Sequence, residues 1–287
     1  MTNLLEKALE FEREGNFQEA AKLYAIAADE GDAAAQCELG RCYHSGKGVD
    51  QDYSKAVEWF TKAAEKGNAE SLFWLGGCYR FGQGVPRDNA KAAELLTKAA
   101  SHGYAFAQFQ LGICYQRGIV VERDDTKAVE WFIKAANQGY VSAQVQLGNC
   151  YQKGIGVELD DTKAFEWFDK AANLDDTPSQ FELGRCYENG RGVERDDAKA
   201  FEWYIRVADK GNSAAQFKVG ECYYNGRGVD QDYSKAVEWY TMAAEAGNPD
   251  AQYNLGQCYA MGFGVVQDDE KSKEWLQKVK ENSPERE

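Results

Sequence analysis

The residues best suited to nucleophilic or metal chemistry are the cysteines, of which the chain has eight in 287 residues. Seven of them occupy one position of a repeated pattern: Cys42, Cys78, Cys114, Cys150, Cys186, Cys222 and Cys258. No Cys-x-x-Cys pair occurs, and His44 and His102 are the only imidazoles, so a zinc site lacks its usual ligands. Equivalent positions in neighbouring helical hairpins lie about 10 Å apart, whereas a disulfide tolerates a Cα separation of about 7 Å. We therefore expect reduced cysteines that pack in the core, with no metal and no cofactor.

The glycines and aspartates that recur with the cysteines also favour a structural role. Gly46-Lys47-Gly48 could cradle a phosphate, but the Gly-x-x-x-x-Gly-Lys-[Ser/Thr] pattern of nucleotide-binding loops does not occur. Asp52 and its equivalents, up to Asp268, stand where the N-cap of a following helix is expected, because a carboxylate there accepts hydrogen bonds from the first-turn amides. No nucleophile, base and orienting acid stand apart from the repeat. The sequence therefore predicts a protein that is not an enzyme.

A strict period of 36 residues organises all of these positions. The segment Leu-Gly-x-Cys-Tyr returns with its glycine at Gly40, Gly76, Gly112, Gly148, Gly184, Gly220 and Gly256. An unbroken period of this length is typical of stacked helical hairpins. Seven full hairpins are predicted, at approximately 33–66, 69–102, 105–138, 141–174, 177–210, 213–246 and 249–280. Residues 1–32 are interpreted as an N-terminal capping hairpin and 281–287 as a polar tail, so we expect an all-α fold of about eight hairpins.

Helical spacing within one unit predicts which side chains are buried. In the first helix, Leu39 and Tyr43 lie on one apolar stripe. Gly40 stands in the middle of that helix, where glycine costs about 1 kcal/mol relative to alanine. We therefore expect another helix to approach Gly40 too closely for a Cβ. In the second helix, Trp59 and Phe60 are predicted to be buried beside alanines, so the recurring tryptophans are interpreted as core rather than as a ligand cage.

The charge of the chain limits its partners. A net charge of −14 repels phosphate backbones and anionic lipid head groups, so nucleic acid and membrane surfaces are not expected as partners. The same charge favours a basic protein or peptide. The start, MTNLLEKALEFEREG, is charged and amphipathic, unlike a signal peptide, and no apolar run of about 18 residues occurs. We therefore expect a cytoplasmic protein, with a monomer as the default state.

The repeated unit resembles a known family. It combines Ala-x-x-x-Leu-Gly-x-x-Tyr, Gly-x-Gly-Val, Asp-x-x-Lys-Ala and Trp-x-x-Lys-Ala-Ala-x-x-Gly within 36 residues. Together these patterns closely resemble Sel1-like repeats, relatives of the tetratricopeptide repeat, over residues 33 to about 280. The resemblance implies a right-handed α/α superhelical solenoid whose first helices line a concave surface, and a role as adaptor or scaffold. The tail of the N-terminal segment, GNFQEAAKLYAIAAD, resembles the second half of a tetratricopeptide repeat.

The residues that differ between units are where a partner would be recognised. First-helix positions three before, one after and four after the Leu-Gly glycine are predicted to face the concave side. The second full hairpin departs most, because Trp74 replaces the Glu, Gln, Lys or Asn of the other units, which favours an interaction hot spot. Trp74 could instead compensate for Leu95, which stands in the tryptophan position. The candidate partner-binding residues are Phe73, Trp74, Arg80, Phe81, Phe109, Gln116, Gln152, Phe181, Glu188, Phe217, Tyr224 and Tyr253.

Other interpretations stay open. The position three before the Leu-Gly glycine is largely aromatic across the units. Packing between adjacent first helices is a competing explanation for these aromatic residues. Tyr224, Tyr253, Met261 and Phe263 predict a second, smaller contact area. For the whole chain, an inhibitor or immunity protein that covers a basic toxin, and a spacer without partners, are alternatives to an adaptor. A β-lactamase-like enzyme is a further alternative, but the secreted family members described as such carry two cysteines per unit and this chain carries one.

Overall fold

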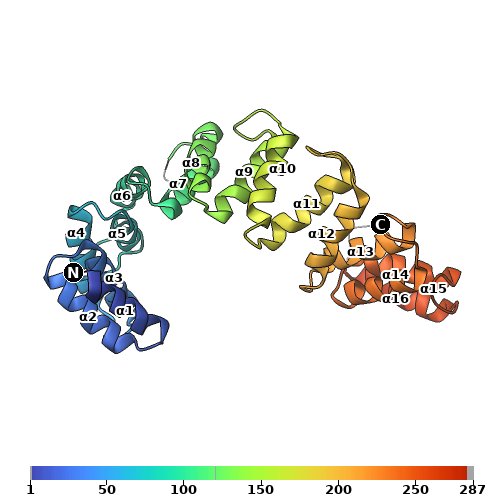
Figure 1. Cartoon of the computed structure of the whole chain (residues 1–287), viewed down its shortest axis with the longest axis horizontal. Helices are drawn as coiled ribbons and strands as arrows, with labels where there is room; N and C mark the ends of the chain where they lie inside the picture. The colour runs from blue at the N-terminus through green and yellow to red at the C-terminus, as the bar shows by residue number, and fades with distance from the viewer. Residues whose placement is uncertain (1, 120, 283–287) are drawn as a thin grey trace. The chain divides into compact units, whose positions relative to one another are not determined.

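The computed structural model describes residues 2–119 and 121–282, and this part of the chain is built from α-helices without a β-strand. Consecutive helices pair as antiparallel hairpins (Figure 1). The helices are α1 (Thr2–Arg13), α2 (Phe17–Asp29), α3 (Ala33–Ser45), α4 (Tyr53–Glu65), α5 (Ala69–Phe81), α6 (Asn89–Ser101), α7 (Ala105–Arg117), α8 (Asp125–Asn137), α9 (Val141–Lys153), α10 (Asp161–Ala172), α11 (Thr177–Asn189), α12 (Asp197–Ala208), α13 (Ser213–Asn225), α14 (Tyr233–Glu245), α15 (Pro249–Met261) and α16 (Asp269–Asn282). The predicted all-α class of stacked hairpins is confirmed.

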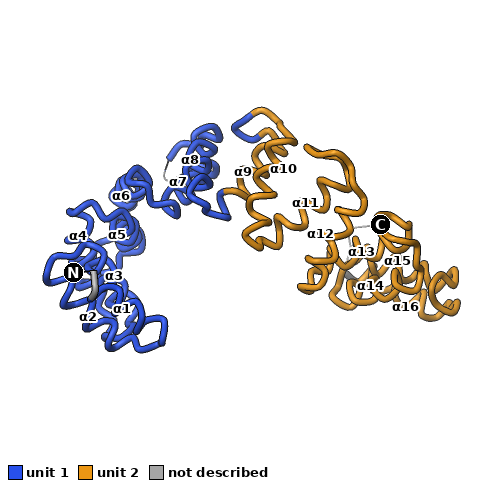
Figure 2. Tube along the Cα trace, in the orientation of Figure 1, with its two compact units in different colours: residues 1–143, 155–157 blue, residues 144–154, 158–287 orange. Residues whose placement is uncertain are grey.

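The chain divides into two compact units, which are coloured separately in Figure 2. Unit 1 comprises residues 1–143 and 155–157, and unit 2 comprises residues 144–154 and 158–287. Helices α1 to α8 belong to unit 1 and α10 to α16 to unit 2, while α9 begins in the first and ends in the second. Of the predicted polar tail, Glu281 and Asn282 end α16, and residues 283–287 lie outside the described residues.

Each hairpin starts and stops its helices with the same chemistry. In α3 and α4, Gly46 ends the first helix with a φ of 73°, which an L-side chain rarely adopts. The predicted N-cap of the second helix is confirmed, because the Asp52 carboxylate accepts a hydrogen bond from the Lys55 amide at 3.0 Å. The same bond forms at every equivalent aspartate: Asp88, Asp124, Asp160, Asp196, Asp232 and Asp268.

The core of a hairpin is one aromatic ring from the second helix, set against the glycine of the first. We call this second-helix position the buried ring position. A Cβ on Gly40 would lie 2.6 Å from the Phe60 ring, so the predicted close approach is confirmed. Rings at this position are at most 1% exposed: Tyr24, Phe60, Phe132, Phe168, Tyr204 and Tyr240. Six hairpins therefore fill their interior with a ring, which in five of them lies against a first-helix glycine.

The recurring tryptophans are less buried than the sequence suggested. Trp59 packs against the core but stays half-buried, whereas its neighbour Phe60 is fully buried. The Lys62 ammonium lies 3.9 Å from the centre of the Trp59 ring, because residues three apart share a helix face. Lys or Arg covers the tryptophan in the same way at Trp131, Trp167, Trp203 and Trp275. The buried stripe of the second helix thus passes through the Phe60 position. The tryptophans lie at the edge of this stripe, where Lys or Arg side chains lie over most of these rings.

The cysteines behave as packing residues. Cys37, Cys42, Cys78, Cys114, Cys186, Cys222 and Cys258 form no disulfide. Burial raises the pKa of the Cys37 and Cys222 thiols to about 12 and that of Cys78 to about 11. These thiols therefore remain protonated near neutral pH, which fits small core side chains rather than nucleophiles.

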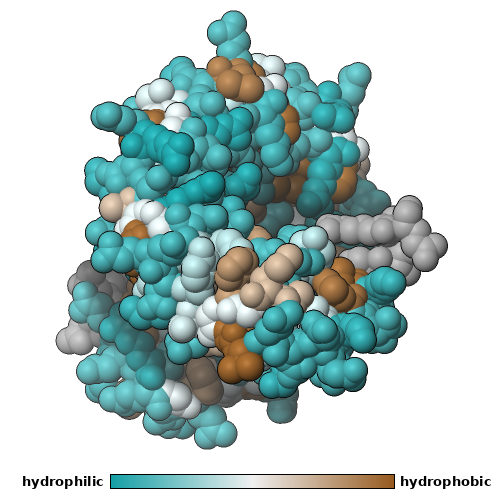
Figure 3. All heavy atoms as spheres, turned by 90° about the vertical axis from the view of Figure 1, so that its right-hand side faces the viewer, coloured by the Kyte–Doolittle hydropathy of each residue, from teal (hydrophilic) through white to brown (hydrophobic). Residues whose placement is uncertain are grey.

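The exposed surface is mostly hydrophilic. On the face drawn in Figure 3, hydrophobic side chains form small patches separated by hydrophilic ones. Among the residues that the structure describes, no helix is both long enough and apolar enough to cross a membrane. The exposed large apolar side chains include Phe81, Met261 and Phe263, which the sequence had singled out.

Candidate interaction site

Helix α6 lacks the large side chains that the other second helices carry. Ala93 stands where most units have valine or phenylalanine, and Leu95 stands where the other full units have tryptophan. Leu96 occupies the buried ring position, which only the last hairpin, with Leu276, also fills with a leucine. Leu95 turns inward and is 5% exposed, while Leu96 is half-buried. The hairpin of α5 and α6 therefore has no ring at its centre.

The glycine pair of α5 enlarges this gap. A Cβ on Gly76 would meet the Ala92 carbonyl at 3.3 Å, the Leu95 Cβ at 3.4 Å and the Leu96 amide nitrogen at 3.6 Å, with no ring among these nearest atoms. By contrast, the leucine of the last hairpin does cover its glycine, with Leu276 Cγ at 3.0 Å from a Cβ on Gly256. Gly77 replaces side chains such as Arg41 and Ile113, and a Cβ there would meet nothing within 4 Å. Gly77 thus leaves open space on α5, whereas at Gly76 the backbone of α6 approaches without an intervening ring.

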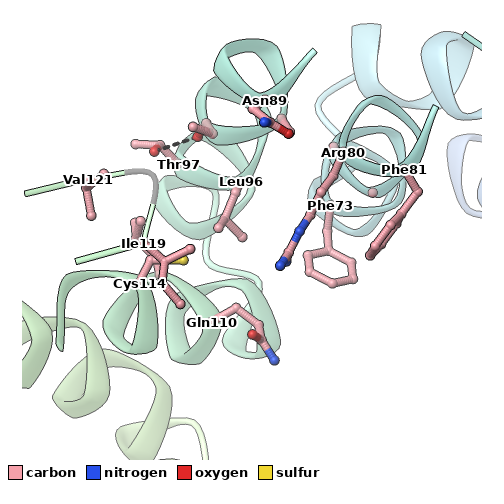
Figure 4. Close-up of a pocket in the computed structure, with 15 residues that line it drawn as sticks. Phe73, Arg80, Phe81, Asn89, Leu96, Thr97, Gln110, Cys114, Ile119 and Val121 are labelled. Carbon is pink, nitrogen blue, oxygen red and sulfur yellow. Dashed lines mark hydrogen bonds between the residues drawn. The ribbon is translucent and has the colours of Figure 1, made fainter. Parts of the chain in front are cut away.

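A cavity of about 260 Å³ occupies the space between α5, α6 and the start of the next hairpin. Phe73, Arg80 and Phe81 of α5 lie on one side of it and Leu96 of α6 on another (Figure 4). Ile119 and Val121 contribute from the connector that follows α7. The lining is mainly apolar, and the cavity opens to solvent beside Phe81, which is 68% exposed. We call it the α5–α6 pocket.

Arg80 gives this pocket a local charge opposite to that of the whole chain. Its guanidinium carbon lies 5.4 Å from the centre of the Phe81 ring, within cation–π range. None of the described residues that line the pocket carries a carboxylate, although the chain has a net charge of −14. The pocket therefore combines apolar walls with one exposed cation at its rim.

Trp74, the residue that first drew attention to this hairpin, faces another side of α5. Its ring stacks on Phe60 with 6.0 Å between ring centres, and its Nε1 donates a hydrogen bond to Glu70 at 3.2 Å. The guanidinium carbon of Arg41 lies 6.0 Å from the centre of the Trp74 ring. The ring contacts of Trp74 are with His44, Phe60 and Phe73, none of which lies on α6. Trp74 thus packs on the preceding hairpin and does not fill the gap in its own.

Trp74 instead helps to line a small polar pocket of about 120 Å³ with Glu38, Arg41 and His44. Arg41 donates to Glu38 at 2.9 Å and lies 3.7 Å from Glu70. Burial raises the pKa of the Glu38 carboxyl, and Arg41 acts against that rise. The structure therefore separates the predicted hot spot into two: Phe73, Arg80 and Phe81 line the α5–α6 pocket, and Trp74 lines its polar neighbour.

Three of the other predicted residues pack on the rings of their own hairpins. The ring centre of Phe109 lies 5.8 Å from that of Phe132, and Phe181 and Phe217 contact Tyr204 and Tyr240 in the same way. Each of the three is half-buried. The side chains at this first-helix position therefore pack on the buried ring of their own hairpin. Each of them also remains partly exposed to solvent.

The remaining predicted residues differ in how far their side chains are engaged. Gln116 and Gln152 are half-buried on α7 and α9. Glu188 accepts a hydrogen bond from the Tyr204 hydroxyl at 2.7 Å and lies 3.2 Å from the Lys218 ammonium. Burial and this carboxylate raise the pKa of Tyr204. Glu188 thus accepts the hydrogen bond of the buried Tyr204 hydroxyl. A phenylalanine at the buried ring position has no hydroxyl and needs no such partner.

Tyr224 and Tyr253 meet at a second pocket, in unit 2. Together with Met261 and Phe263 they line a cavity of about 280 Å³, and these are the four residues that the sequence grouped as a smaller contact area. Tyr253 is 50% and Met261 63% exposed. Phe263 stacks on Tyr233 with 5.1 Å between ring centres. Aromatic side chains make up most of the lining of this pocket. The hairpin of α13 and α14, on which Tyr224 lies, keeps its buried ring, Tyr240.

Within the described residues, no group of three or more His, Cys, Asp or Glu side chains is placed to hold a metal ion. The α5–α6 pocket contains the Cys114 thiol as its one potential nucleophile, and burial raises the pKa of that thiol. What the pocket can do is bind an apolar group beside a cation.

The repeat pattern itself decides the family. The Sel1 repeat model matches residues 11–32, 33–68, 69–104, 105–140, 141–176, 177–212, 213–248 and 249–281. This chain belongs to the Sel1 repeat family. Its eight Sel1 repeats coincide with the eight helical hairpins, so the resemblance seen in the sequence is confirmed. The first match begins inside α1, and the family match indicates no catalytic family.

Two solved Sel1 structures support this assignment. One is a protective antigen present in uropathogenic Escherichia coli strains, with an SLR fold: it is 38% identical, with a TM-score of 0.80, and the match covers 92% of this chain. The present chain spans 57% of the length of that antigen. The other is a Sel1 repeat protein from Oxalobacter formigenes, 33% identical with a TM-score of 0.64, covering 96% of this chain and 86% of that one. No curated protein matches the chain.

Within the Sel1 pattern, sequence reasoning missed the residues that create the α5–α6 pocket. It noted Leu95 but passed over Ala93, Leu96 and Gly77, because it searched for added aromatic or charged side chains. The signal was present as a shared loss of volume in three positions of one repeat. Comparing the size of each residue with its counterparts 36 residues away would have found it.

Proposed function

We propose that this Sel1 repeat chain is a non-enzymatic interaction scaffold, an adaptor that binds a peptide or protein segment along the first-helix face predicted to be concave. The observation that carries the proposal is the α5–α6 pocket, an apolar cavity of about 260 Å³ that opens beside the exposed side chains of Arg80 and Phe81. An exposed aromatic next to an arginine at the mouth of an apolar cavity is the composition of an interface hot spot. Membership of a repeat family that generally mediates protein contacts supports the same reading.

Two features narrow the proposed partner and setting. The net charge of −14 favours a partner that is basic over most of its surface, because such a partner is steered toward an acidic chain. The seven cysteines without a disulfide favour the cytoplasm, where thiols are kept reduced. The second pocket, around Tyr253 and Met261, is proposed as a further contact area within unit 2.

The proposal is tested by selecting binders from a displayed library of random 12-residue peptides on the full chain. We expect enrichment of peptides that bind the parent, and at least tenfold weaker binding by the double variant Arg80→Ala, Phe81→Ala, which is the loss of about 1.4 kcal/mol or more typical of hot-spot residues. The matched control is Val266→Ala, an apolar side chain that is 87% exposed on the connector before α16.

Both side chains of the double variant lie at the surface, so the helix should keep its fold, and circular dichroism checks this. Equal affinity of the parent and the double variant for every selected peptide would remove the α5–α6 pocket from the proposal. A selection that enriches no peptide over a surface without protein would contradict peptide binding by this chain altogether.

A further inference from the structure

We infer that the α5–α6 pocket accepts one aromatic side chain of the bound segment, which takes the place of the ring that this hairpin lacks. The inference rests on the proposed function and adds the chemistry of the group that is recognised. It also makes the binding surface a property of one repeat, since the last hairpin, which likewise has a leucine at the buried ring position, covers its glycine with Leu276.

The sibling hairpins supply the template for the occupant. In the hairpin of α7 and α8, the Phe132 ring fits between the glycine of the first helix, Gly112, and the neighbouring Phe109. The Ala128 carbonyl forms the third wall, 3.1 Å from a Cβ on Gly112. This frame of glycine, aromatic residue and alanine recurs around an aromatic ring in this stack.

The α5–α6 pocket keeps the frame and omits the ring. Its walls include Gly76, Phe73 and Ala92, the residues 36 positions before Gly112, Phe109 and Ala128. Phe73 also contacts Phe106 of the next hairpin with 4.9 Å between ring centres, as its counterpart Phe109 contacts Tyr140 at 5.2 Å. The pocket therefore has the walls of an aromatic site, with Gly76 lining a cavity where its counterparts meet a ring.

The volume fits a ring with room for its backbone attachment. An apolar cavity of about 150 Å³ is large enough to bind benzene, and this one measures about 260 Å³ and is open to solvent on one side. Phenylalanine, tyrosine and tryptophan side chains are thus all within its capacity. Leu96 is only half-buried and Ala93 is small, so neither side chain fills the pocket. The space remains for the aromatic side chain of the bound segment.

Arg80 favours a ring over an aliphatic side chain of similar size. Its guanidinium already lies over the Phe81 ring at 5.4 Å and also lines the pocket, so a second ring in the pocket would meet the same cation. The absence of a carboxylate among the described lining residues leaves lysine and arginine side chains without an ion pair there. An aromatic side chain is therefore the one occupant that matches the walls, the volume and the charge.

The experiment uses N-acetyl-phenylalanine methylamide as the probe and amide chemical shifts of the full chain as the readout. We expect shifts confined to the amides around Gly76, Gly77 and Leu96, with a dissociation constant on the order of millimolar for so small a ligand. N-acetyl-cyclohexylalanine methylamide, which has the same shape without the π-system, should bind about two- to fivefold more weakly.

The deciding variant is Leu96→Phe, which restores the sibling ring and fills the pocket from within. We expect it to abolish the shifts, while the matched control Leu276→Phe, at the same position of a hairpin whose glycine is already covered, leaves them unchanged. Gly77→Ile, which introduces the side chain found at Ile113, is a second way to block the mouth if Leu96→Phe disturbs the fold. Melting curves of all three variants establish that they are folded.

Each outcome has one meaning. The inference is overturned if the probe shifts no pocket amide, if it binds the parent and both blocked variants equally, or if the cyclohexyl compound binds as well as the phenylalanine compound. If library peptides bind but neither blocked variant weakens them, the scaffold function stands and the aromatic pocket falls. If the probe binds at the pocket while no peptide is selected, the pocket stands and the proposed function falls.

Discussion

At the scale of single residues, the helix glycines have unequal reasons to be glycine. A Cβ on Gly112 would lie 2.5 Å from the buried Phe132 ring, whereas a Cβ on Gly76 would lie no nearer than 3.3 Å to any atom. Alanine gains about 1 kcal/mol of helix propensity at either site. At Gly112, overpacking of about 1–3 kcal/mol outweighs that gain.

We therefore expect Gly112→Ala to lower the melting temperature more than Gly76→Ala does. Thermal unfolding followed by circular dichroism measures both, and the second variant is the control for the first. A larger loss for Gly76→Ala than for Gly112→Ala would contradict the assignment of the missing ring.

Residues also show what sequence reasoning could and could not reach. The period placed Gly40 against a close neighbour and Asp52 at an N-cap, and both predictions are confirmed because each depends on local geometry alone. The burial of Trp59 was overestimated, since adjacent helix positions differ by about 100° in direction and only Phe60 points into the core. Which of two neighbouring aromatic residues is buried depends on the rotation of the helix against its partner, which periodicity defines only approximately.

At the scale of helices, α6 buries less apolar side-chain material than its counterpart α8. Its buried residues are Leu95, Ala99 and Ala100, whereas α8 buries Val129 and Phe132 in addition to three alanines. Local opening costs less free energy where fewer apolar contacts are lost.

We expect the amides of α6 to exchange with deuterium faster than those of α8 in the parent chain. Leu96→Phe should slow exchange in α6 and leave α8 unchanged, because it restores the missing contacts. Hydrogen exchange followed by mass spectrometry makes the comparison, and equal protection of the two helices in the parent would contradict it.

The helices explain why the fold was predictable and the pocket was not. Each helix boundary is marked by its own residues, such as the aspartate before α4 and the glycine after α3, so the hairpins could be placed from the sequence. The pocket requires Ala93, Leu96 and Gly77 to be small at once, on two helices whose relative placement the sequence does not state. The positions that the repeats share describe the stack, whereas the cavity arises because several side chains are small in the same hairpin.

At the scale of the whole chain, the column of thiols links stability to alkaline pH. Burial raises the pKa of Cys37 and Cys222 to about 12, and that of Cys78, Cys186 and Cys258 to about 11, from the ordinary thiol value of 9.0. The folded pKa is the higher one, so this stabilisation is complete below about pH 9. It is lost as the pH rises toward the folded pKa, because the unfolded chain releases its protons first.

We therefore expect the melting temperature to be flat from pH 7 to about 8.5 and to fall steeply above pH 9. Each buried thiol contributes a loss of up to about 1.4 kcal/mol per pH unit in this range. Thermal melts across the pH series measure the slope, and Cys222→Ala, which removes one of these thiols, should make it shallower. A melting temperature that does not change between pH 8 and 10.5 would contradict the burial of the thiols as protonated groups.

The unbroken period of 36 residues has a consequence for how such a chain changes over generations. Because the seven full copies align without insertion or deletion, exchange between misaligned copies of the coding sequence would add or remove whole hairpins and leave every interface of the same kind. The hairpin of α5 and α6 would travel in such an event as one unit, together with its missing ring. A recognition site encoded as an absence within a single repeat could thus be duplicated, moved along the array or erased by one exchange, without a new fold having to be found.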